Sequence, residues 1–104
     1  MEKLQKMLKP LVLEAVRDAM FKHGLEYTSK HEMYGVLAEE VLEAREEYDM
    51  IRGGMEDLLD SIHLGQDSMA KTDLEGIRAS AERLACEAIQ IAAVCVKAKG
   101  LMQA

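Results

Sequence analysis

The sequence predicts an all-α protein, a bundle of four to five helices in a single domain over residues 1–104. Hydrophobic residues make up 49% of the chain, yet it contains only three tyrosines, one phenylalanine and one proline. Domains rich in β-structure use more aromatic and turn-forming residues than this. Apolar residues also recur at three- and four-residue spacing along most of the chain, which is the period of an amphipathic helix. A chain of this length builds one hydrophobic core.

Four helices are predicted from this spacing, over residues 2–23, 30–52, 55–69 and 72–99. Gly24 and the Gly53-Gly54 pair are expected to end the first and second helices, because glycine readily adopts the backbone conformation that closes a helix. Ser29 and Thr72 are each followed three residues later by a glutamate. This pattern is a capping box, and it predicts the starts of the second and fourth helices. Short connections between helices favour a bundle.

The negative charge of the protein is concentrated in one stretch. The net charge is −6, and residues 32–60 contain ten acidic side chains and two arginines, a local charge of −8. This distribution argues against a nucleic-acid partner, because phosphate contacts need clustered lysine and arginine. No apolar run approaches the roughly 18 residues of a membrane span, and the N-terminus lacks the features of a secretion signal. We expect a cytoplasmic protein with no membrane partner.

Five glutamates fall within residues 39–47, and three of them follow one border of an apolar helical stripe. Glu40, Glu43 and Glu47 lie along this border, where carboxylates repel one another unless positive charge lies among them. Glu87 borders the stripe of the last helix in the same way, so it faces Glu40 and Glu43 if the two stripes pack together. Such a site suits Mg²⁺. Spacing alone favours the alternative, a solvated acidic surface.

Two segments extend this pattern into recognisable motifs. Residues 31–43 read HEMYGVLAEEVLE, and residues 87–93 read EAIQIAA. Together they resemble the MazG-like all-α nucleotide pyrophosphohydrolases, a family recognised by Glu-Glu-x-x-Glu on one helix and Glu-x-x-Asp on a later one. The resemblance covers residues 29–97. It implies a helical homodimer or homotetramer that uses Mg²⁺ to hydrolyse nucleoside triphosphates to the monophosphate and pyrophosphate.

The resemblance also implies roles for individual residues. Glu40 and Glu43 match the first two metal ligands of the family, and Glu87 matches the third. Glu39 would orient the attacking water. The expected catalytic residues are therefore Glu39 and Glu40. Gln90 occupies the fourth ligand position, where the family has aspartate. An amide oxygen can bind Mg²⁺ or Mn²⁺ weakly, but it adds no charge and cannot act as a base.

The expected function is a metal-dependent nucleotide pyrophosphohydrolase that acts on ribo- or deoxynucleoside triphosphates or on modified nucleotides. A triphosphate carries about four negative charges, so an acidic site binds it only through cations. The expected contacts to the outer phosphates are Arg52 and Lys97, with Lys30 and Lys99 as further candidates. Gln90 keeps an alternative open, a catalytically degenerate relative that acts as a nucleotide-binding or protein-interaction module. Eight methionines and the apolar run over residues 88–96 predict a homo-oligomer.

Overall fold

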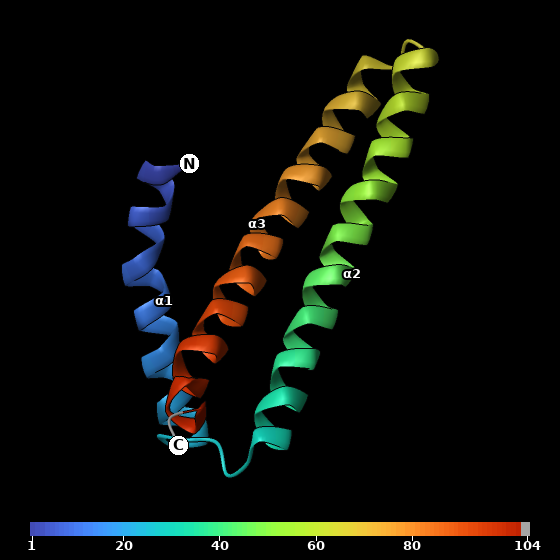
Figure 1. Cartoon of the computed structure of the whole chain (residues 1–104). Helices are drawn as coiled ribbons and strands as arrows, with labels where there is room; N and C mark the ends of the chain where they lie inside the picture. Colours follow the sequence, from blue (N-terminus) through green and yellow to red (C-terminus); the bar gives the residue numbers. More distant parts are fainter. Residues whose placement is uncertain (103–104) are drawn as a thin grey trace. The chain divides into compact units, whose positions relative to one another are not determined.

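The computed structural model describes residues 1–102, which form three long α-helices and one short 3-10 helix (Figure 1). The helices are α1 (Glu2–His23), α2 (Lys30–His63), α3 (Asp67–Ala98) and η1 (Lys99–Met102). Within these residues there is no β-strand, which confirms the all-α class. None of the described helices combines the length and the apolar character of a membrane span.

The predicted count of four to five helices is not confirmed in the described part of the chain, where three α-helices and the short η1 are found. α2 continues through Gly53-Gly54 and ends before Gly65, whose φ is 67°. Thr72 lies inside α3, where its hydroxyl donates to the Ser68 carbonyl at 3.3 Å instead of capping a new helix. A glycine costs a helix only about 1 kcal/mol relative to alanine. Packing between α2 and α3 can offset that cost, so these local stop and start signals do not divide the helices.

The end of α1 and the start of α2 agree more closely with the boundaries predicted from the sequence. Gly24 has a φ of 89° and donates its N–H to the Met20 carbonyl, so it ends α1 as predicted. The backbone N–H of Glu32 donates to the Ser29 hydroxyl at 3.0 Å, which is the predicted cap of α2. The second half of the capping box differs, because the Glu32 carboxylate accepts a hydrogen bond from the Thr28 hydroxyl. This contact secures the loop before α2.

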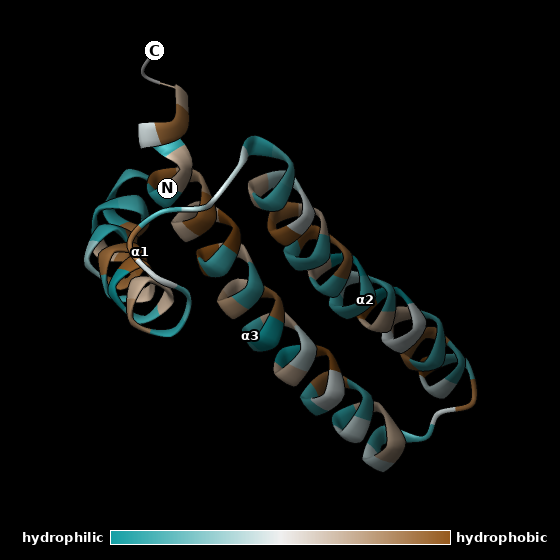
Figure 2. Ribbon diagram, turned by 90° about the horizontal axis from the view of Figure 1, so that it is seen from below, coloured by the Kyte–Doolittle hydropathy of each residue, from teal (hydrophilic) through white to brown (hydrophobic). Residues whose placement is uncertain are grey.

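The described chain divides into two compact units. The first contains Met1–Leu42 and the chain from Glu87 onward, that is, α1, the start of α2, the end of α3 and η1. Hydrophobic and hydrophilic residues are interspersed along all three α-helices (Figure 2), and apolar residues at three- and four-residue spacing give a helix an apolar face to bury. Two small clusters form the core of the first unit, and their buried members are Ala15, Val16 and Ala93 in one and Tyr27, Val94 and Ala98 in the other.

The second unit, Glu43–Cys86, is a helical hairpin in which polar contacts join α2 and α3. The buried hydroxyl of Ser61 donates to Asp73 Oδ2 at 2.6 Å. Arg83 Nε donates to both carboxylate oxygens of Glu47, at 3.0 and 2.9 Å. Glu47, the third glutamate on the border of the acidic stripe, therefore forms an ion pair within the hairpin.

Two neighbouring glycines in α2 provide a matched test of how closely α2 and α3 pack in this hairpin. A Cβ atom on Gly54 would lie 2.8 Å from Ile77 Cγ1, whereas one on Gly53 would have no described atom within 4 Å. Gly53→Ala is therefore expected to stabilise the protein by about 0.5–1 kcal/mol through helix propensity. Gly54→Ala should lose that gain to the clash, which costs about 1–3 kcal/mol. Urea denaturation compares the two, and equal stabilisation by both would contradict the close approach of α2 and α3.

Candidate metal centre

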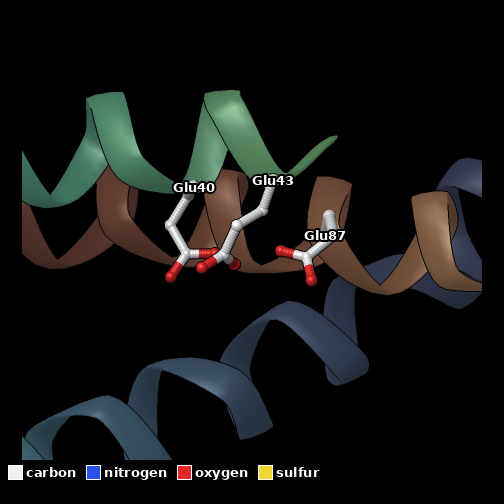
Figure 3. A group of neighbouring side chains, drawn as sticks. All are labelled: Glu40, Glu43 and Glu87. Atoms are coloured by element: carbon white, nitrogen blue, oxygen red, sulfur yellow. The ribbon is translucent and has the colours of Figure 1, made fainter. Parts of the chain in front are cut away.

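Three glutamates bring their carboxylates together in the structure. Glu40, Glu43 and Glu87 each offer an oxygen, and these oxygens all lie within 4.8 Å of one another. Glu40 and Glu43 are one turn apart on the uninterrupted helix α2, and Glu87 reaches them from α3 (Figure 3). All three residues are partly buried. The proximity of Glu87 to the other two, expected from the helical stripes, is therefore confirmed.

The chemistry of this donor set suits a hard divalent cation. All three groups are carboxylates, and Mg²⁺ and Mn²⁺ prefer oxygen ligands to the nitrogen and sulfur that favour zinc. Octahedral Mg²⁺ holds oxygens at about 2.1 Å, so opposite ligands are about 4.2 Å apart. The glutamate oxygens all lie within 4.8 Å of one another, which is the scale of this separation, so the three glutamates fit such an ion.

A cavity of about 600 Å³ adjoins the cluster through Glu40. Pockets that enclose small-molecule ligands span roughly 300–1,000 Å³, so this one has the size for a nucleotide. Its lining belongs entirely to the first unit and includes Glu39 and Glu40 from α2 and Gln90 from α3. The structure therefore gathers the predicted water-orienting residue, a predicted metal ligand and the atypical amide around one space.

The end of α1 forms another wall of this cavity, which the sequence analysis missed. Asp18, Lys22 and His23 all line it. No part in the site was predicted for α1. A signal was available, because Asp18 and Lys22 lie one turn apart beside the apolar stripe of α1, as Glu40 and Glu43 do on α2. What the sequence does not show is which border of the stripe faces a cavity.

Tyr27 and Lys97 form a buried pair next to this cavity. Tyr27 lines it, and the ammonium of Lys97 lies 4.2 Å from the centroid of the Tyr27 ring, a cation–π contact. Lys97 is only 6% exposed, and no described residue accepts a hydrogen bond from its Nζ. Burial, together with the charges of Glu32 and Glu40, raises the pKa of the Tyr27 phenol above its ordinary value. The phenol is therefore neutral near pH 7 and can donate a hydrogen bond.

The two predicted phosphate-binding residues lie in different surroundings. Lys97 is held against Tyr27 in the first unit, whereas Arg52 is exposed on the part of α2 that belongs to the hairpin. Arg52 is not among the residues that line the cavity. Phosphate binding by either residue stays a prediction.

Charge decides what this cavity can bind. Its lining carries four carboxylates, those of Asp18, Glu32, Glu39 and Glu40, against the single ammonium of Lys22. A polyphosphate would be repelled by this set unless a cation accompanies it. A small anionic ligand and a divalent cation are therefore expected to bind together, with the cation on the glutamates beside the cavity.

Comparisons with known proteins add no family assignment. No protein-family model, no curated protein and no solved structure matches this chain significantly. The likeness to the MazG-like pyrophosphohydrolases therefore rests on the two short motifs. The glutamate cluster and the cavity beside it are the features of the structure that bear on function.

Proposed function

We propose that the protein is a metal-dependent nucleotide pyrophosphohydrolase. The observation that carries this proposal is the convergence of Glu40, Glu43 and Glu87, with oxygens within 4.8 Å, beside a cavity of about 600 Å³. In this proposal the three glutamates hold Mg²⁺ or Mn²⁺, and Gln90 is a weak fourth ligand. The motif resemblance supports the choice of reaction, in which a nucleoside triphosphate and water give the monophosphate and pyrophosphate.

The residues of the cavity have distinct tasks in this reaction. When bound, the metal ion offsets phosphate charge and lowers the pKa of a water for attack on the α-phosphorus. Glu39 is exposed in the cavity wall, where its carboxylate can orient that water and accept its proton. Gln90 cannot take this proton, since its amide is neutral and is not a base. Proton acceptance is therefore assigned to Glu39.

Metal binding is expected to stabilise the folded protein. An ion at 100 times its dissociation constant adds about 2.7 kcal/mol of stability if it binds only the native state. Millimolar Mg²⁺ or Mn²⁺ should therefore raise the melting temperature of the wild type, and this rise should disappear in the double variant Glu40→Gln, Glu43→Gln. Glu46→Gln is the control, because Glu46 is exposed on the same helix and lies outside the cluster. Equal metal stabilisation in all three proteins would contradict the proposed centre.

Gln90 favours a second candidate function. Its neutral amide lines the cavity at the position that matches an aspartate in the MazG-like pattern. A protein with this substitution can bind a nucleotide with its metal without cleaving it, as a catalytically degenerate nucleotide-binding or protein-interaction module. This candidate predicts that nucleotide and metal, added together, stabilise the folded protein and that no pyrophosphate is released.

We also propose that the protein works as a homodimer or homotetramer in the cytoplasm, where nucleoside triphosphates are abundant. α1 exposes Leu4 by 60%, Leu8 by 41% and Leu11 by 52%. These residues recur at helical spacing and form one exposed apolar face. Monomeric proteins rarely expose large contiguous apolar patches, and a second copy of the chain would cover this one.

A further inference from the structure

We propose that Lys22 and His23, at the end of α1, bind the phosphates of the substrate that leave as pyrophosphate. This inference rests on the proposed function and gives α1 a specific part in it. Both residues line the same cavity as Glu39, Glu40 and Gln90. The cavity thus has carboxylates on α2, where the metal ion is proposed, and a wall on α1 where Lys22 and His23 lie beside the carboxylate of Asp18.

The chemistry of the two α1 residues matches a polyphosphate. The Lys22 ammonium has three donors, and the His23 imidazole donates a hydrogen bond from at least one nitrogen in either protonation state. They are the two basic residues in the last turn of α1. The carbonyl end of a helix carries partial negative charge and favours cations there. The helix end therefore favours the Lys22 ammonium at this position, and the attraction for a phosphate comes from the Lys22 and His23 side chains alone.

Packing fixes the α1 wall relative to α3. Ala15 and Val16 of α1 are buried against Ala93 of α3, and the partly buried Met20 and Ile89 pack on this cluster. Ala93 follows Gln90 by about one helical turn, and Lys22 follows Val16 by less than two. The same small cluster thus sets where Lys22 lies with respect to Gln90. The backbone that carries Lys22 is therefore positioned in advance, and only its exposed side chain has to be ordered when a ligand binds.

Other cations near the cavity are less suited to this task. The ammonium of Lys97 is 4.2 Å from the ring centroid of Tyr27, and its residue is almost wholly buried. Lys22 and His23 are exposed and line the cavity themselves. The Lys22 ammonium and the His23 imidazole are therefore the described donors of this wall that a phosphate in the cavity can reach without a change in the core.

Binding of inorganic pyrophosphate in the presence of Mg²⁺ tests this assignment without turnover. Isothermal titration calorimetry should show an affinity about 10- to 100-fold weaker in the double variant Lys22→Ala, His23→Ala, since charge-assisted hydrogen bonds are lost. Lys22→Arg should keep the affinity within about threefold, because the charge is retained. Lys9→Ala is the matched control, an exposed lysine of α1 that is not among the residues lining the cavity.

The outcomes separate this inference from the proposed function. Unchanged pyrophosphate affinity in the double variant, with metal stabilisation still dependent on Glu40 and Glu43, would overturn the role of Lys22 and His23 alone. An equal loss in Lys9→Ala would also overturn it, because the effect would then reflect net charge. If the wild type bound neither pyrophosphate nor metal, both proposals would fail. Circular dichroism of each variant confirms that α1 is still helical.

Discussion

Glu40→Gln and Glu43→Gln are each expected to abolish pyrophosphate release while leaving the helical content unchanged. Glutamine has nearly the same shape as glutamate, but it removes the negative charge that a divalent cation requires. Even residues that only support metal ligands change affinity or activity by about 10- to 100-fold. Loss of a direct ligand should therefore lower kcat/KM by at least about 100-fold, as measured by pyrophosphate release with a fixed nucleotide and Mg²⁺.

Two other glutamates of α2 serve as controls for these variants. Glu46 is exposed, so Glu46→Gln should leave kcat/KM unchanged. Glu47 is paired with Arg83 in the hairpin, so Glu47→Gln should reduce stability by at most about 1 kcal/mol and spare activity. Full activity in Glu40→Gln, or an equal loss in Glu46→Gln, would contradict the assignment of the metal ligands.

Ala93→Leu is expected to destabilise the protein and to weaken pyrophosphate binding together. Ala93 is 1% exposed and packs with Ala15 and Val16, where α1 meets α3. Leucine adds three carbons to this contact, and they should lower the free energy of unfolding by about 1–3 kcal/mol because a packed core has no space for them. The added volume pushes α1 away, and Lys22 moves with it. Thermal melting and calorimetric titration with pyrophosphate and Mg²⁺ measure the two effects.

An exposed alanine of the same helix gives the comparison. Ala85→Leu should change stability by no more than about 0.5 kcal/mol, as surface substitutions generally do, and should leave pyrophosphate affinity unchanged. Normal stability in Ala93→Leu would contradict the tight contact between α1 and α3. Normal pyrophosphate affinity in a destabilised Ala93→Leu would instead show that α1 does not supply the phosphate contacts.

Features set by local chemistry were predictable from the sequence. Gly24 ends α1 and Ser29 caps α2, because each depends only on the backbone within a few residues. The approach of Glu87 to Glu40 and Glu43 was also predictable. All three border apolar stripes, and two helices that pack through their stripes bring the borders together.

Features set by contacts between distant segments were not predictable from the sequence. Gly53-Gly54 and Thr72 carry ordinary stop and start signals, yet both lie inside long helices, where packing across the hairpin outweighs small local preferences. The cation–π contact of Lys97 with Tyr27 joins residues 70 positions apart. The wall formed by Lys22 depends on how α1 docks against α3. Periodicity identifies the faces of a helix and leaves open which neighbour each face meets.

The most direct test of the proposed function is product analysis with purified protein. A panel of common and modified nucleoside triphosphates is incubated with Mg²⁺ or Mn²⁺, and nucleoside monophosphate and pyrophosphate are quantified. The proposed metal centre at Glu40, Glu43 and Glu87 predicts that at least one nucleotide yields the two products in equal amounts, only when metal is present. Release of neither product from any nucleotide, together with no metal-dependent rise in melting temperature, would contradict it.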